Sequence, residues 1–106
     1  MKALGQLLRE ARDAKGLLLR EVGAAINADT AMISKFERGE RKPTREQISL
    51  LAKFLDINEN EILVTYLSDR VVSDLADEDV AIEALHVAEK KINLIRKKGG
   101  EKKSNR

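Results

Sequence analysis

The sequence contains no cysteine, one histidine and one proline, and its aromatic residues are two Phe and one Tyr. Without cysteine the chain has no disulfide and no thiol nucleophile, and one histidine cannot build a metal site alone. No apolar run is long enough to cross a bilayer, and the first residues mix charges where a signal peptide has an apolar centre. We therefore expect a cytoplasmic protein with no membrane segment, no metal and no cofactor.

The charges are divided into three stretches. Residues 1–56 carry eleven Lys/Arg and eight Asp/Glu, residues 57–89 carry one and nine, and residues 90–106 carry eight and one. The net charges are therefore +3, −8 and +7, which sum to the overall +2. Such segregation concerns partners and solubility rather than fold. The acidic middle is either a set of solvated helix faces or a surface for a basic partner.

Apolar residues recur at helical spacing along the chain, and no segment shows the sustained alternation of a strand. The spacing predicts helices over about 4–15, 19–26 and 30–38, a fourth after Thr44, a fifth after Asn58 and a last one that ends at Gly99. The residues expected to face inward in the first five are Leu4, Leu7, Leu8, Ala11, Val22, Ile26, Ile33, Phe36, Ile48, Leu51, Ala52, Leu55, Ile62, Leu63, Tyr66 and Leu67.

Turn and capping residues fit these helices. Asn27 tolerates the left-handed backbone conformation, Asp29 can cap the third helix, and Gly39 can end it. Three further caps are expected from Thr44 with Gln47, from Asn58 with Glu61, and from Asp77 before the last helix.

The last helix has an apolar seam that steps alternately by four and three residues: Ala81, Leu85, Ala88, Ile92 and Ile95. Val80, Val87 and Leu94 form a second stripe beside it. Two heptads are too few to specify a coiled coil by themselves. The helix can fold back onto its own domain or form a dimer with a second copy, and the fifth helix competes for the dimer role.

Two short helices joined by about three residues, within residues 17–39, match a helix-turn-helix, whose second helix enters the DNA major groove. The stretches "LGQLLREARDAKGL", "EVGAAINADTAMISKFERGERKPT" and "LLAKFLDINENEIL" closely resemble the Xre/Cro-type repressor family of phage and bacterial regulators. The resemblance implies an all-α fold with a five-helix, repressor-like DNA-binding domain over residues 1–67. A C-terminal amphipathic helix for dimerisation or packing follows over residues 68–98, and a basic disordered tail over residues 99–106.

The resemblance also implies roles for individual residues. Arg12 and Glu37 are expected to form a structural pair between the first and third helices. The expected base-reading residues are Thr30, Ala31, Met32, Ser34 and Lys35. Thr30 and Ala31 can touch thymine methyl groups, and Lys35 can reach guanine acceptors. The expected phosphate contacts are Arg20, Arg38, Arg41, Lys42 and Arg45.

The sequence departs from the family at the start of the second helix. Where the family commonly has Ser or Thr and then Gln, this chain has Leu18 and Leu19. Either Leu18 joins the core and Leu19 lies near the surface, or Leu19 contacts a thymine methyl group or a protein partner. Asn27 replaces the usual glycine of the turn, a change that the turn should tolerate.

The function predicted first is a sequence-specific transcriptional regulator that binds an inverted-repeat operator in double-stranded DNA as a homodimer. A restriction-modification controller is the weaker, more specific guess. The alternative is an antitoxin-like or other protein-interaction module that uses the acidic segment 59–89. We expect no enzyme, because neither a Cys/His pair nor a glycine-rich phosphate loop is present. His86 is expected at a surface or interface.

Overall fold

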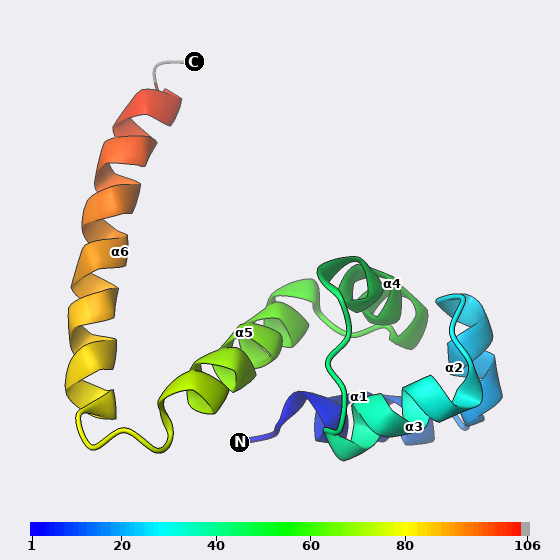
Figure 1. The fold of residues 1–106 in the computed structure, drawn as a ribbon. Helices are drawn as coiled ribbons and strands as arrows, with labels where there is room; N and C mark the ends of the chain where they lie inside the picture. Colours follow the sequence, from blue (N-terminus) through cyan, green and yellow to red (C-terminus); the bar gives the residue numbers. More distant parts are fainter. Residues whose placement is uncertain (105–106) are drawn as a thin grey trace. The chain divides into compact units, whose positions relative to one another are not determined.

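The computed structural model describes the backbone of residues 1–104 and the side chains of residues 1–99. Within this part, all regular secondary structure is helical, which confirms the all-α class (Figure 1). The helices are α1 (Leu4–Ala14), α2 (Leu19–Ala25), α3 (Thr30–Arg38), α4 (Arg45–Leu55), α5 (Glu59–Leu75) and α6 (Ala81–Ser104). The chain divides into two units, Met1–Val72 and Ser73–Arg106. The boundary expected after residue 67 and the division after Val72 both fall within α5.

One hydrophobic core holds the first unit together. Its buried side chains are Leu4, Leu7, Leu8, Val22, Ile26, Ile33, Phe36, Ile48, Leu51, Ala52, Leu55 and Ile62. Ala11, Leu63 and Tyr66 pack against this cluster partly buried. The predicted inward faces are thus confirmed except at Leu67, which is 42% exposed. Leu67 lies five residues after the fully buried Ile62, hence about 140° around the helix from it.

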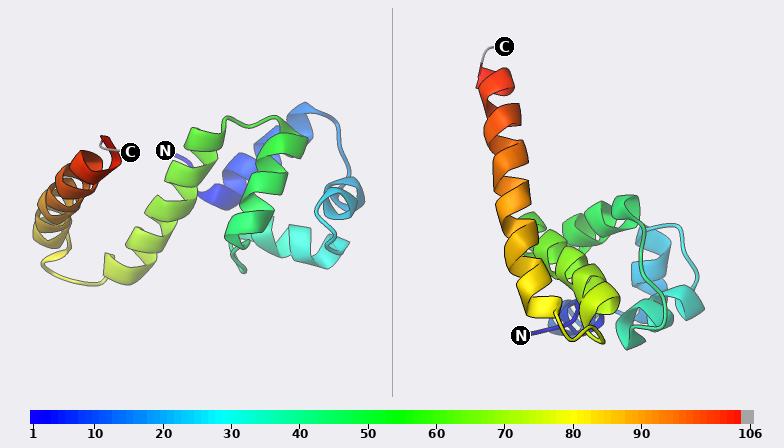
Figure 2. Two further views of the ribbon diagram at one scale, coloured as in Figure 1. Left: turned by 90° about the horizontal axis from the view of Figure 1, so that it is seen from above. Right: turned by 60° about the vertical axis from the view of Figure 1, so that its left-hand side comes forward.

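The predicted turns and caps of the helix-turn-helix are confirmed. Asn27 has φ 57° and Gly39 has φ 73°, both in the left-handed region. The Asp29 carboxylate accepts a hydrogen bond from the Met32 N–H at 2.7 Å, at the start of α3. In Figure 2, α2 and α3 follow each other through this turn.

The caps of α4 and α5 are also present. Thr44 and Gln47 exchange hydrogen bonds in a capping box, at 2.9 and 3.1 Å. The Asn58 side chain accepts a hydrogen bond from the N–H of Glu61 at 3.0 Å. Asp56, with φ 56°, ends α4 in the left-handed conformation, which Asp and Asn adopt more readily than most residues because of their short polar side chains.

The expectation that Leu18 joins the core and Leu19 lies near the surface is wrong, because the two residues have exchanged these places. Leu18 is 49% exposed, whereas Leu19 is half-buried and packs against the core. Helix α2 begins at Leu19, which therefore shares a face with the buried Val22 three residues later. Leu18 precedes the helix, and its backbone N–H donates to the Glu21 carboxylate at 2.8 Å. The Glu21 half of a capping box is thus formed, although Leu18 has no polar side chain for the other half.

The second unit contains α6, a continuous helix in Figures 1 and 2. Two expectations about its ends are wrong. Asp77 is not its cap, because the helix begins only at Ala81. The helix does not stop at Gly99 but continues to Ser104, since glycine lowers helix propensity by about 1 kcal/mol without forbidding the helical conformation. Residues 105 and 106 of the predicted tail lie outside the described residues.

Candidate nucleic-acid interface

Helix α3 presents one face to the core and the other to solvent. Ile33 and Phe36 are each 2% exposed and hold the inner face in place. On the outer face, Thr30, Ala31 and Lys35 are exposed and Ser34 is half-buried. Four of the five predicted base-reading residues therefore lie together on the accessible side of one short helix.

Met32 differs from these four. Its side chain is half-buried and packs against the hydrophobic core. It follows Ala31 by about 100° around the helix, which turns it toward the core edge. Only part of the Met32 side chain is available for contact with another molecule.

A basic loop leaves the C-terminal end of α3. Gly39 ends the helix in the left-handed conformation, and the chain then reaches Pro43, which is buried and anchors the loop. The predicted phosphate-contacting residues on this loop and at its two helix ends are exposed: Arg38, Arg41, Lys42 and Arg45. Arg20, also exposed, lies on α2. The sequence order of turn, loop and capping box thus brings four positive charges close to the end of α3.

The Arg38 guanidinium forms an ion pair with the neighbouring Glu40. Its Nε lies 3.2 Å from Oε2 of Glu40, and the two side chains are 57% and 53% exposed. Exposed pairs of this kind contribute about 0–1 kcal/mol. A phosphate can therefore replace Glu40 at little cost.

Arg12 and Glu37 form the predicted pair between α1 and α3. Nε and Nη2 of Arg12 donate to the two oxygens of Glu37 at 2.7 and 3.0 Å, and Nη1 donates to the carbonyl of Leu17 at 2.9 Å. The hydrogen bond to Glu37 raises the pKa of Arg12 further above its usual range. One side chain thus fixes α3 and the segment before α2 onto α1.

Helices α1 and α3 approach each other closely at Gly5. A Cβ built on Gly5 would lie 2.3 Å from the carbonyl oxygen of Glu37 and 2.7 Å from that of Phe36. Gly23 is similarly constrained, because its Cβ would lie 2.5 Å from the carbonyl oxygen of Ala28 in the turn. Both Gly5 and Gly23 are lone glycines inside a helical pattern, which is a signal of close packing.

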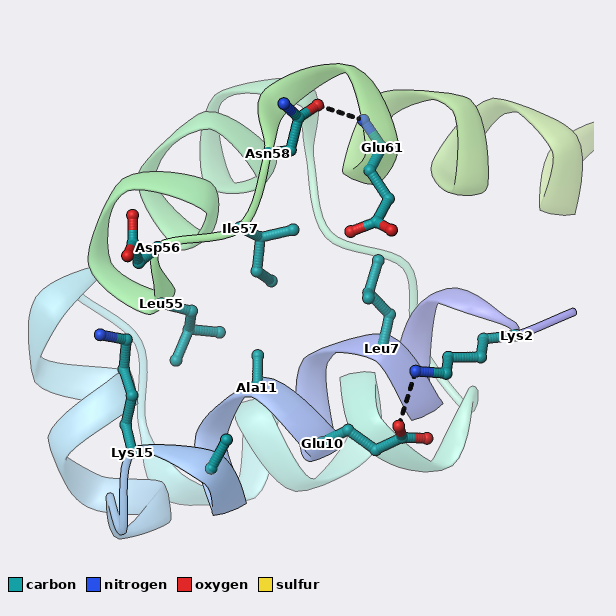
Figure 3. A pocket seen from close by; sticks show the side chains of 11 residues that line it. Lys2, Leu7, Glu10, Ala11, Lys15, Leu55, Asp56, Ile57, Asn58 and Glu61 are labelled. Atoms are coloured by element: carbon teal, nitrogen blue, oxygen red, sulfur yellow. Dashed lines mark hydrogen bonds and ion pairs between the residues drawn. The ribbon is translucent and has the colours of Figure 1, made fainter.

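A surface groove of about 400 Å³ lies between α1 and the turn that joins α4 to α5 (Figure 3). Leu7 and Ala11 of α1 face Leu55 and Ile57 across it. At its edge the Lys2 ammonium lies 2.7 Å from a Glu10 oxygen, and this hydrogen bond lowers the pKa of Glu10. Three acidic and two basic residues line the groove, so it is not suited to a phosphate backbone.

The predicted dimer seam lies on α6. Leu85, Ile92 and Ile95 are 36%, 52% and 69% exposed. Ala88 is also exposed, and Ala81 is half-buried. Val80 and Val87 of the second stripe help to line a shallow hollow of about 450 Å³ along the same helix.

The side chains of the described residues include no group of three or more His, Cys, Asp or Glu that could hold a metal ion. His86 is exposed on α6. None of the described helices combines the length and apolar character needed to span a membrane. The strongest chemical feature of the first unit is therefore an exposed helix face beside a cluster of positive charges.

Comparisons with known proteins agree with this geometry. A family model described as helix-turn-helix matches residues 8–62. The transcriptional regulator ClgR of Mycobacterium tuberculosis, in strains CDC 1551 / Oshkosh and H37Rv, is 30% identical over 63 residues. The match covers 59% of this chain and 56% of that protein, so this chain spans little more than half the length of these relatives.

Two crystal structures of the clp gene regulator ClgR from Corynebacterium glutamicum are similar in fold. One is 27% identical with a TM-score of 0.53, and the match covers 62% of this chain and 86% of that chain. The other is 22% identical with a TM-score of 0.54, covering 91% and 88% respectively, and shows likeness of fold alone. The described helices thus have counterparts in solved regulator structures.

Proposed function

This chain belongs to the Xre/Cro type of the helix-turn-helix family, and we propose that it regulates transcription as a homodimer that binds an inverted-repeat operator. In this proposal α3 of each copy enters the major groove and the basic loop contacts the adjacent backbone. Two α3 helices would occupy successive major grooves about 34 Å apart. The cytoplasm is the proposed location. That this chain is a restriction-modification controller stays a prediction. The relatives found are regulators rather than enzymes.

The observation that carries the proposal is the distribution of charge around α3. Glu37 is the only acidic residue of this helix, and both of its oxygens are directed onto Arg12. The outer face keeps Lys35, and Arg38 continues toward the basic loop. A polyanion approaching this face therefore meets positive charge, while the helix is held by the Arg12–Glu37 pair.

The proposed contacts differ in what they contribute. Thr30, Ala31, Ser34 and Lys35 are assigned to base edges, with the exposed part of Met32 beside them. The residues assigned to phosphates are Arg20, Arg38, Arg41, Lys42 and Arg45. Phosphate contacts set position and supply most of the salt dependence, whereas base contacts supply sequence discrimination. For six to ten phosphate contacts, affinity should fall on the order of a thousandfold or more between low and moderate salt.

Selection from a randomised duplex pool, followed by sequencing and a salt series, tests the proposal. We expect an enriched inverted repeat. Lys35→Ala should weaken binding to it by about 1–3 kcal/mol and relax one base position. Arg41→Ala should weaken all sequences alike and reduce the salt slope by about one. Lys53→Ala, an exposed lysine of α4, is the matched control and should leave binding unchanged.

Binding without any enriched sequence would overturn operator reading. Thr30→Ala separates the two kinds of contact further, because it removes a short base-facing side chain without changing charge. It should reduce the preference for the selected site while leaving affinity for random duplex intact. Equal loss on both duplexes would assign Thr30 to the helix rather than to the bases.

Protein contact is the second candidate activity. α5 exposes Val64, Leu67 and Val71 at helical spacing, 67%, 42% and 38% exposed, on the side away from Ile62. This face favours an interface, either between two copies or with another protein. That the acidic segment 59–89 binds a basic partner stays a prediction. Sedimentation of Leu67→Asp tests the α5 face, because an interface there should be lost when a charge is placed in it.

A further inference from the structure

We propose that α6 pairs with α6 of a second copy in antiparallel orientation, with the two helices crossing near Ala88. This inference deepens the proposed homodimer and rests on it. It fixes the partner as a second copy of this chain and the direction in which the two seams meet. Neither the seam alone nor the exposure of its residues defines that direction.

The charges along the second unit are separated into two blocks of opposite sign. Residues 77–89 contain five acidic residues and no Lys or Arg, namely Asp77, Glu78, Asp79, Glu83 and Glu89. Residues 90–98 contain five basic residues and no acid, namely Lys90, Lys91, Arg96, Lys97 and Lys98. All ten are exposed; Asp77, Glu78 and Asp79 lie in the turn just before α6, and the other seven lie on the helix. The sign changes between Glu89 and Lys90, beside the middle of the apolar seam.

This separation decides between the two possible orientations. In a parallel pair, the basic block of one copy would lie against the basic block of the other, and the acidic blocks would likewise repel each other. In an antiparallel pair each acidic block lies along a basic block, which lowers the electrostatic energy of the dimer. The macrodipoles of antiparallel helices also oppose each other favourably.

The seam itself fits a crossing near Ala88. Ala88 is the middle of the five seam residues, so its small side chain allows close approach where the helices cross. In the antiparallel arrangement the small Ala81 of one copy meets the end that carries the larger Ile92 and Ile95 of the other. The apolar face is broad, because Val80, Val87 and Leu94 are also 56%, 49% and 61% exposed.

The absence of cysteine from the chain allows a direct test by disulfide formation. Single variants Ala81→Cys, Ala88→Cys, Ile92→Cys and Ile95→Cys are prepared in the full chain and oxidised alone or in mixed pairs. Two Ile95→Cys positions in an antiparallel dimer would be about 21 Å apart along the axis, seven residues on either side of Ala88. Disulfide formation needs Cα atoms within about 7 Å.

We expect Ala88→Cys to form a covalent dimer by itself. Ala81→Cys should cross-link when mixed with Ile95→Cys, on the order of tenfold more than either variant alone. Ile92→Cys lies three residues, about 4.5 Å along the axis, out of this register and should cross-link to Ala81→Cys less well. Asn93→Cys, on the polar side of α6, is the matched control for random collision. Circular dichroism of each reduced variant checks that the helix is retained.

Efficient cross-linking of Ile95→Cys alone would overturn the antiparallel orientation in favour of a parallel one. A chain that stays monomeric, or a dimer lost by Leu67→Asp but not by Ile92→Asp, would overturn the assignment of the seam to α6. Operator selection is a separate measurement. A cross-linked antiparallel dimer that selects no operator would defeat the proposed DNA reading and leave the α6 pairing standing.

Discussion

The carboxylate of Asp69 in α5 accepts a hydrogen bond from the backbone N–H of Leu4, the first residue of α1, at 2.8 Å. The residue before α1 is Ala3, which has no side-chain acceptor. A residue 65 positions away thus supplies the cap that α1 lacks locally. Because Gly5 follows Leu4 and touches the end of α3, this bond also connects α5 to the element proposed to read DNA.

Asp69→Ala should lower the free energy of unfolding by about 1 kcal/mol, because it removes a cap and the negative charge at a helix N-terminus. Denaturant unfolding followed by circular dichroism measures the loss. Asp69→Asn, whose amide oxygen can still accept the bond, should lose less. Asp74→Ala is the control, an exposed acid on the same helix. Equal loss from both alanine variants would mean that the Leu4 bond contributes nothing.

Breaking the Arg12–Glu37 pair should destabilise the protein more than any surface change. The two side chains are only 15% and 8% exposed, and removing one partner of a buried pair costs about 3–5 kcal/mol. Arg12→Ala and Glu37→Ala should therefore each lower stability by roughly 3 kcal/mol. The measurement is a double-mutant cycle by denaturant unfolding.

In that cycle, the double variant Arg12→Ala/Glu37→Ala should lose clearly less stability than the sum of the two single losses, because no unpaired charge remains. Arg38→Ala provides the exposed comparison and should cost less than about 1 kcal/mol. Additive losses in the cycle would show that the two side chains act independently, contrary to their hydrogen bonds.

Gly5→Ala should destabilise the first unit even though alanine is the better helix former. The new Cβ would lie 2.3 Å from the carbonyl oxygen of Glu37, so α1 and α3 must separate. Overpacking of this kind costs about 1–3 kcal/mol, enough to exceed a gain of about 1 kcal/mol in helix propensity. Gly99→Ala is the matched control, since its Cβ would meet nothing within 4 Å. Thermal unfolding should separate the two, with a lower Tm for Gly5→Ala alone.

Turn residues, capping residues and apolar spacing predicted most of this fold. The features that they did not predict depend on contacts between residues far apart in the sequence. Asn27, Asp29 and Thr44 act on their own neighbours, so their turns and caps could be assigned from spacing alone. The partner of Leu4 could not be assigned, because Asp69 is distant in sequence and looks like any acid on a solvated helix. Leu67 was misassigned because apolar residues lie on both sides of α5, and one helical period cannot say which side faces the core.

The candidate interface follows the same division. The resemblance to Xre/Cro-type regulators places Thr30, Ala31 and Lys35 on the outer face of α3, and these side chains are exposed there. Their part in base reading stays a prediction. The ion pair between Arg38 and Glu40 could not be predicted, because it depends on the turn that Gly39 makes after α3. The resemblance implied a phosphate contact for Arg38 and gave no sign of its pairing with Glu40.

Glu40→Gln should strengthen binding to DNA of any sequence. Glu40 holds Arg38 at 3.2 Å and adds a negative charge at the helix end assigned to phosphate contact. Its removal frees the guanidinium and reduces repulsion, which for exposed groups amounts to roughly 0.5–1 kcal/mol, or a few-fold in affinity at low salt. The gain should shrink as salt is raised, and it should be equal for the selected operator and a random duplex, because phosphates carry no sequence information. Fluorescence anisotropy with both duplexes across a salt series measures this, with Asp74→Asn as the control for a lost acid elsewhere. A gain confined to the operator would instead place Arg38 at a base edge.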